Sequence, residues 1–111
     1  MNESEFQSEV VKAAKAAGWR VCHIRPAVQN GRRITPAAKG FPDLVLVKPP
    51  RVLFLELKRE DGKRGPQQVE WIRDLQACDE VAAYFARPSQ LDAVRRLIAS
   101  EPTTNPGGPP P

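Results

Sequence analysis

The period of the hydrophobic and polar positions changes several times along the chain, and each change marks an expected element. Apolar residues recur every three or four positions over 3–17, which predicts an amphipathic helix that ends at Gly18. The segment 19–25 is short and rich in β-forming residues, and Pro26 follows it, so we expect a strand there. Residues 26–40 are polar, basic and interrupted by proline and glycine. They predict a long loop, the kind of segment that is often functional or mobile.

Two apolar runs follow at 44–47 and 52–57, and only the sequence KPPR separates them. Such a short connection predicts an antiparallel hairpin with both prolines confined to the turn.

The rest of the chain alternates helix and strand patterns. Proline suits the first turn of a helix, which we expect at 66–77. A strand is predicted at 81–86, followed by a closing helix at 89–99 with Ser89 as its N-cap. A right-handed crossover through the 66–77 helix would make the strands on either side of it parallel. The predicted fold is therefore α/β, in the order αβββαβα, with a mixed four-stranded sheet flanked by helices.

Composition limits the size and setting of this fold. Residues 101–111 hold five of the twelve prolines and no large apolar residue, which predicts a disordered tail. The part at 1–100 can form one domain with a single modest core. Without a signal peptide or a long apolar run, we expect a cytoplasmic protein of a bacterium, or of a phage in its host, and no membrane partner. Cys22 and Cys78 have no metal-ligand spacing and are expected to be reduced core residues.

The charge is moderately basic. The formal net charge is +4, and Glu101 is the only charged residue of the tail, so the remaining part carries about +5. Such an excess suits a polyanionic partner without requiring one, and basic loops that serve only solubility are the plain alternative. The basic residues gather in two loop regions, with Arg20, Arg25, Arg32, Arg33 and Lys39 in the first and Arg59, Lys63 and Arg64 in the second.

Charged residues also interrupt the predicted hairpin, where folding alone does not require them. Because side chains alternate along a strand, Glu56 and Lys58 would share the face opposite the leucines of that strand. Asp43 enters the partner strand after Gly-Phe-Pro, and the hairpin can bring its carboxylate towards Glu56. Such a cluster is costly without a cation, and hard oxygen ligands suit Mg²⁺ or Mn²⁺. The alternative is a plain turn at Asp43 and a surface ion pair between Glu56 and Lys58.

In their order along the chain, GFPDLVLV, FLELK and GPQQVEW resemble the VRR-NUC family, a branch of the PD-(D/E)XK nuclease superfamily. The resemblance runs from the first helix to about residue 98 and implies a restriction-endonuclease-like core. It implies that Asp43 and Glu56 bind a divalent metal, that Lys58 is the catalytic lysine, and that the Leu57 carbonyl is an extra metal ligand. Gln68 would contact a water on the metal or the scissile phosphate, although Gln67 could take the same role.

The family also places a glutamate on the first helix, and three residues are candidates for it here. Glu3 best matches the family's spacing and stands one helical turn from Gln7, so its side chain can point over the inward face. Glu5 is the alternative metal ligand, and Glu9 is expected to be a solvated surface residue.

Three further residues are interpreted as parts of the fold. His23 lies on the strand before the long loop and is more typical of a structural histidine than of a catalytic one. Trp19 and Trp71 are expected in the core rather than on a base-stacking surface.

The resemblance implies a metal-dependent enzyme that hydrolyses DNA phosphodiesters. Backbone contacts to DNA are expected from Arg25, Arg32, Arg33, Lys39, Lys63 and Arg64. Small stand-alone family members resemble Holliday-junction resolvases, so we expect branched DNA as substrate and a homodimer. Flap or non-specific cleavage, a non-catalytic nucleic-acid-binding module of the same fold and a small α/β interaction domain are the alternatives.

Overall fold

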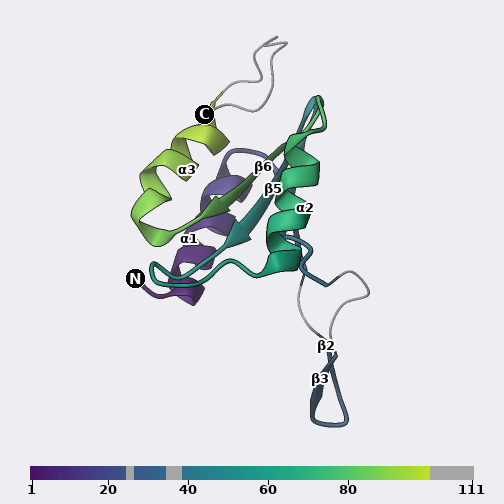
Figure 1. The fold of residues 1–111 in the computed structure, drawn as a ribbon. Coiled ribbons are helices and arrows are strands. Elements are labelled where there is room, and N and C mark those ends of the chain that lie inside the picture. Colours follow the sequence, from purple (N-terminus) through teal and green to yellow (C-terminus); the bar gives the residue numbers. More distant parts are fainter. Residues whose placement is uncertain (25–26, 35–38, 101–111) are drawn as a thin grey trace.

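The computed structural model describes residues 1–24, 27–34 and 39–100 (Figure 1). The predicted tail and Arg25 lie outside these residues. The elements in chain order are α1 (Glu3–Ala16), β1 (Arg20–His23), β2 (Ala27–Gln29), β3 (Arg32–Ile34), β4 (Leu44–Lys48), β5 (Arg51–Leu57), α2 (Pro66–Gln76), β6 (Ala82–Ala86), the 3-10 turn η1 (Pro88–Gln90) and α3 (Leu91–Ala99).

The central sheet has the strand order β1-β4-β5-β6. β4 pairs antiparallel with both β1 and β5, whereas β5 and β6 are parallel and are joined through α2. Helix α2 covers one face of the sheet, and α1 and α3 lie together on the other (Figure 1). The prediction of a mixed four-stranded α/β sheet flanked by helices is confirmed.

The segment predicted as a loop without secondary structure contains a second, two-stranded sheet. β2 and β3 pair antiparallel around Asn30 and Gly31, whose φ angles are 53° and 73°. Positive φ at both central residues closes a two-residue hairpin, and Asn-Gly is the pair that adopts it most readily. In Figure 1 this hairpin stands away from the four-stranded sheet, with Arg32 and Arg33 on β3. The prediction that this segment is a loop without strands is therefore wrong.

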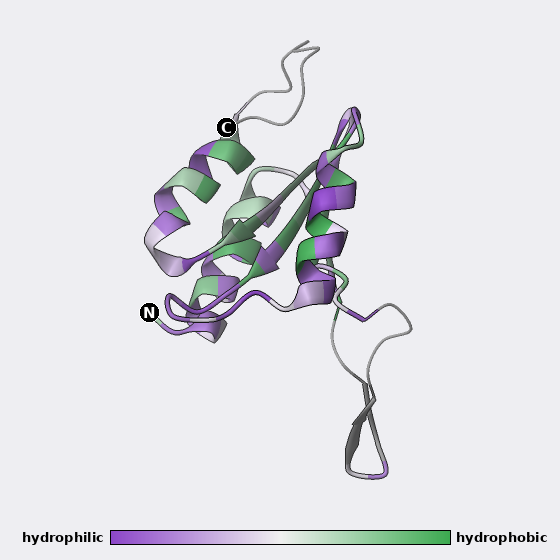
Figure 2. Ribbon diagram, in the orientation of Figure 1, coloured by the Kyte–Doolittle hydropathy of each residue, from purple (hydrophilic) through white to green (hydrophobic). Residues whose placement is uncertain are grey.

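The core lies between the sheet and the α1–α3 pair. Leu53, Leu55 and Leu57 point to this side from β5 and are buried against Phe6 and Val10 of α1. Figure 2 shows the corresponding colouring, green on the sheet strands and mixed green and purple on the helices. Within residues 1–24, 27–34 and 39–100, no helix is long and apolar enough to cross a membrane.

The first tryptophan is a core residue, as predicted. Trp19 is buried, and its indole Nε1 donates a hydrogen bond to the Ile98 carbonyl at 2.9 Å. A buried indole needs such a partner, so this bond fixes the end of α3 beside the start of β1.

Two other sequence predictions are wrong. Cys22 and Cys78 are both exposed, because Cys22 lies on the edge strand β1 and Cys78 follows the last turn of α2. Ser89 does not cap α3, which begins at Leu91 after a 3-10 turn that starts at Pro88. The Ser89 N–H donates instead to the Glu60 carboxylate, which holds the loop after β5 in place.

Candidate active site

The β4–β5 register brings the two predicted carboxylates together. Leu44 is opposite Leu55, so Asp43, one residue earlier, is opposite Glu56. The backbone N–H of Leu57 donates a hydrogen bond to Asp43 Oδ2 at 3.1 Å, which fixes the aspartate against the end of β5. Glu56 is 3 % exposed and is the only buried charged or polar residue among the described side chains. A carboxyl group is therefore held inside the protein beside a second one.

Its surroundings make Glu56 hard to ionise. Burial, and next the charge of Asp43 and its hydrogen bond to Glu56, raise the pKa of Glu56 to about 9, and the charge of Glu3 adds to this rise. The positive charge of Lys58 acts in the opposite direction but is too weak to offset the others. At neutral pH Glu56 thus holds its proton, and a cation at this position would replace that proton.

Gln68 joins the carboxylate pair to helix α2. Its Oε1 accepts a hydrogen bond from the Gly65 N–H at 2.7 Å and so satisfies a backbone donor at the start of the helix. Its Nε2 donates to Glu56 Oε2 at 3.4 Å. Gln68 therefore satisfies the start of α2, as a first-turn glutamine commonly does, and also contacts Glu56. It is Gln68, and not the exposed Gln67, that reaches Glu56.

Gly40 seats the turn before Asp43 directly on the first turn of α2. Its φ is 86°, and a Cβ atom at this position would lie 2.6 Å from the Cβ of Gln67 and 2.9 Å from the backbone nitrogen of Gln68. Only glycine fits, for both its conformation and its size. The same contact therefore sets the position of Asp43 and the position of Gln68.

An aromatic cluster holds the same turn from the side. The Phe41 ring meets Trp71 edge-on at a centroid distance of 5.0 Å and Phe54 at 6.0 Å. Trp71 Nε1 also donates a hydrogen bond to the Lys39 carbonyl at 3.2 Å. Trp71 is thus half-buried and packs against the turn, but it lies outside the core between the sheet and α1, so the prediction that it is a core residue is wrong.

The N-terminal helix approaches the site with Glu3. The Asn2 side chain caps α1 by accepting a hydrogen bond from the Glu5 N–H at 2.8 Å, which starts the helix at Glu3. The charge of Glu3 acts on the pKa of Glu56, and Glu5 is not among the causes of that shift. In Figure 1 the start of α1 lies beside the loop that follows β5. These observations favour Glu3 over Glu5 as the helix carboxylate.

Two other residues of α1 make structural contacts. Glu9, predicted to be merely solvated, pairs with Arg95 of α3 at 2.9 Å and ties the two helices together. Gln7 Nε2 lies 3.3 Å from Nδ1 of His23, the last residue of β1. This contact joins β1 to α1, in keeping with the predicted structural role of His23.

Three of the predicted DNA-binding residues belong to loops next to the site. Lys39 precedes the Gly40 turn, and Lys63 and Arg64 belong to the loop between β5 and α2, where all three are exposed. The Arg64 guanidinium lies over the Phe85 ring at 4.4 Å. Arg32 and Arg33 lie on β3 of the two-stranded sheet.

The donor atoms suit a small, hard divalent cation. Asp43 and Glu56 offer carboxylate oxygens at one point, and the burial of Glu56 removes the water that would otherwise stabilise its charge. Within the described residues, no group of three or more His, Cys, Asp and Glu side chains is arranged to hold a metal ion. Carboxylate oxygens such as those of Asp43 and Glu56 are ligands that Mg²⁺ or Mn²⁺ can use, because these ions bind through one or two carboxylates and keep positions for water and phosphate.

Two residues near the site were not among those predicted. Phe85 of β6 pairs with Glu56 in the parallel register, so the two are neighbours on one sheet face. Arg87 donates hydrogen bonds to the carbonyls of Arg59 and Glu60, at 2.6 and 3.0 Å, and anchors the loop after β5. No sequence signal marks either residue, because the register of a parallel pair depends on how the crossover helix packs.

Comparisons with known proteins agree with this geometry. No protein-family model and no curated protein matches the chain. A solved structure titled "VRR_NUC domain" is similar at 27% sequence identity, with a TM-score of 0.53, and the match covers 83% of this chain and 91% of that chain. The resemblance to VRR-NUC domains that the motifs indicated is confirmed at the level of the fold.

Proposed function

Because the chain has the fold of a VRR-NUC domain, we propose that it is a divalent-metal-dependent nuclease that hydrolyses DNA phosphodiester bonds. The observation that carries the proposal is the buried Glu56 carboxyl group held opposite the half-buried Asp43. A protein that held two carboxyl groups together only for stability would gain more from apolar residues of similar volume. The pair is readily explained if a cation and a phosphate complete it.

The metal would be held by residues of β5, of the turn before β4 and of α1. Asp43 and Glu56 would hold Mg²⁺ or Mn²⁺, the Leu57 carbonyl would add a ligand, and Glu3 would act from the start of α1. Such an ion, when bound, activates a water and polarises the phosphate.

Two polar side chains would act on the substrate. Lys58 would stabilise negative charge that builds up on the phosphate, because it follows the buried strand and its charge already acts on Glu56. Gln68 would orient a water or a phosphate oxygen with the amide group that contacts Glu56.

The basic loops would bind the DNA backbone on either side of the cut. Contacts of this kind add affinity without sequence information. The candidate residues are Arg25, Arg32, Arg33, Lys39, Lys63 and Arg64.

Replacing Arg32 and Arg33 together by alanine should make the affinity less dependent on salt. The slope of log affinity against log salt concentration should become less steep by about 0.9 for each phosphate that the protein no longer neutralises. An unchanged slope would remove this hairpin from the interface.

We further propose that the substrate is branched DNA and that the active form is a homodimer. Two copies of the chain would place two sites on one branched molecule.

The decisive experiment is incubation of the protein with four-way junction, flap and linear duplex DNA, with Mg²⁺, with Mn²⁺ and with chelator. Cleavage that needs metal, fails in Asp43→Asn and favours branched DNA is the expected result. Binding without cleavage under all these conditions would instead favour a non-catalytic nucleic-acid-binding module. A protein that neither binds nor cuts DNA would favour an interaction domain.

A further inference from the structure

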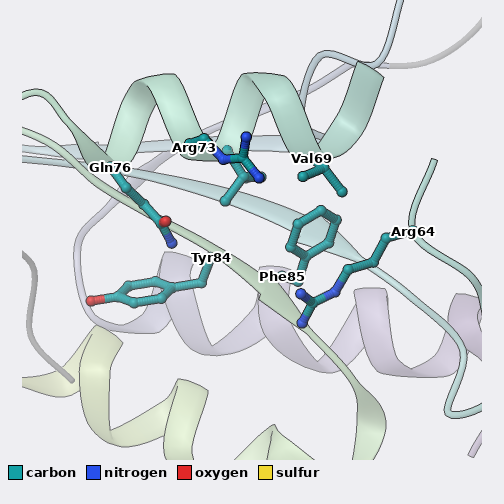
Figure 3. Close-up of a pocket in the computed structure, with 7 residues that line it drawn as sticks. Arg64, Val69, Arg73, Gln76, Tyr84 and Phe85 are labelled. Carbon is teal, nitrogen blue, oxygen red and sulfur yellow. The ribbon is translucent and has the colours of Figure 1, made fainter. Parts of the chain in front are cut away.

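A pocket of about 330 Å³ lies between α2 and β6, next to the candidate site (Figure 3). Its floor is apolar and aromatic, and all the charged residues of the described lining are arginines. The lining consists of Arg64, Val69, Ile72, Arg73, Gln76, Tyr84 and Phe85.

The two arginines are free to bind an anion. Both are exposed, and within residues 1–24, 27–34 and 39–100 neither guanidinium forms an ion pair. Figure 3 shows Arg64 beside the Phe85 ring, with Arg73 further along α2. A guanidinium that stacks on a ring keeps its in-plane N–H donors for a phosphate. The pocket therefore offers phosphate donors beside an aromatic face.

The position of the pocket relates it to the carboxylates. Phe85 is the β6 partner of Glu56, and neighbouring strands lie about 4.8 Å apart. A nucleic-acid strand with one phosphate at Glu56 would therefore place an adjacent nucleotide over Phe85. Gln76 closes the other end of the pocket, where its Nε2 donates a hydrogen bond to the Ala83 carbonyl at 2.8 Å.

We propose that the α2–β6 pocket binds one unpaired nucleotide next to the scissile phosphate, and this inference rests on the proposed nuclease function. The base would pack on Phe85 and Val69, and its phosphate would contact Arg64 and Arg73. A base within a duplex is stacked on both faces and paired along one edge, so it cannot enter such a pocket. The pocket thus selects DNA with an unpaired nucleotide beside the cut, as at a flap or a junction arm.

The test is a comparison of binding to two fluorescent DNAs in chelator, where no cleavage occurs. One is a fully paired duplex, and the other is the same duplex with a single unpaired nucleotide at its centre. Arg64→Gln, Arg73→Gln and Phe85→Leu should each weaken binding of the second DNA at least about fivefold more than binding of the first. Phe85→Leu keeps an apolar side chain at this position but removes the stacking surface.

Arg96→Gln is the matched control. Arg96 is an exposed arginine of α3 that, within the described residues, forms no ion pair, so its replacement makes the same charge change outside the pocket. It should weaken binding of both DNAs equally. Equal losses on the two DNAs in the three pocket variants, or no loss, would overturn the pocket assignment. Failure of the nuclease proposal would appear separately, as wild-type protein that cuts no DNA when metal is added.

Discussion

The two ends of the β4–β5 hairpin carry charges of opposite sign and differ in how the surrounding protein stabilises these charges. At the turn, Lys48 and Arg51 pair across the strands. The Lys48 ammonium donates a hydrogen bond to the Ala17 carbonyl at the end of α1, at 2.7 Å. The Arg51 guanidinium lies over Trp19 and donates to the Leu97 carbonyl in the last turn of α3 at 3.1 Å. Cations at this end therefore satisfy carbonyl groups that helices leave without partners.

At the other end, Asp43 faces the buried Glu56, and burial together with the charge of Asp43 raises the pKa of Glu56 to about 9. Only Lys58 supplies a positive charge among the causes that shift the pKa of Glu56, and its effect is outweighed. The turn end thus stabilises the fold, whereas the carboxylate end costs stability in the protein alone. Functional sites are where such conflicts between local chemistry and stability are expected.

The largest expected effect comes from removing one carboxylate. Asp43→Asn and Glu56→Gln should each lower metal-dependent cleavage of branched DNA by about 100- to 1000-fold or more, since each removes a negatively charged ligand from the site. Single-turnover rates with Mg²⁺ and with Mn²⁺ would measure the loss. Lys48→Met is the control from the opposite end of the hairpin and should keep the wild-type rate. Comparable losses in all three variants would mean that the two ends do not differ in function.

The next effect concerns the turn that delivers Asp43. Gly40→Ala should reduce the free energy of unfolding by about 3 kcal/mol, because alanine is strained at positive φ and its Cβ would overlap the first turn of α2. Urea unfolding would measure the change. Cleavage should also fall, since the turn and α2 must move apart and Gln68 moves with the helix.

Gly31→Ala is the matched control for this variant. Gly31 also has a positive φ, 73°, but a Cβ atom there would meet nothing within 4 Å. Only the conformational strain remains, which costs about 1 kcal/mol. Equal losses of stability in the two variants would show that the fit of Gly40 against α2 contributes nothing.

The sequence predicts much of this arrangement, because most of it depends on local periodicity. Alternation in VLFLEL separates Glu56 from the leucines, and the short KPPR connection predicts the hairpin. Whether Asp43 stands opposite Glu56 or one residue away depends on the register, and a shift of one residue would turn its side chain to the other face.

The features that the sequence did not predict depend on long-range packing or on a signal of only two residues. Phe85 becomes a neighbour of Glu56 only through the crossover that places β6 beside β5. Cys22 appears apolar in the sequence, yet it lies exposed because β1 is an edge strand. By contrast, the β2–β3 hairpin was signalled by Asn30-Gly31 and was missed because the flanking strands are short and polar.

The third prediction concerns the turn end of the hairpin. Arg51→Met should lower the free energy of unfolding by about 1–3 kcal/mol, because the Leu97 and Ser100 carbonyls lose a charged donor and Trp19 loses its cation. Thermal unfolding would measure this loss. The cleavage rate at a temperature where the variant is fully folded should match that of the wild type. A variant that unfolds normally but cuts slowly would place Arg51 in the function of the site.

The smallest expected effect is a change in stability at the carboxylate end. Unlike the Gly40 and Arg51 substitutions, this one should raise the free energy of unfolding. In chelator at neutral pH, Glu56→Gln should raise the free energy of unfolding by about 1 kcal/mol, which corresponds to a rise of about 4–8 °C in the midpoint of thermal unfolding for a domain of this size. In the unfolded chain Glu56 ionises above its ordinary pKa of 4.5, whereas in the folded protein it keeps its proton up to about pH 9. Over this range the folded state binds more protons, so the wild-type protein loses stability as the pH rises, and a glutamine has no proton to lose.

The difference between Glu56→Gln and wild type should therefore be small below about pH 4.5, grow with pH and level off near pH 9. Thermal unfolding of both proteins at several pH values across this range would measure it. Added Mg²⁺ or Mn²⁺ should then stabilise the wild type more at higher pH, because the ion takes the place of the proton, and should stabilise the variant less. A Glu56→Gln protein that is less stable than wild type at pH 8 in chelator would contradict this account. In that case the hydrogen bonds of Glu56 to Asp43 and Gln68 would outweigh the cost of burying it, and the two ends of the hairpin would both serve the stability of the fold.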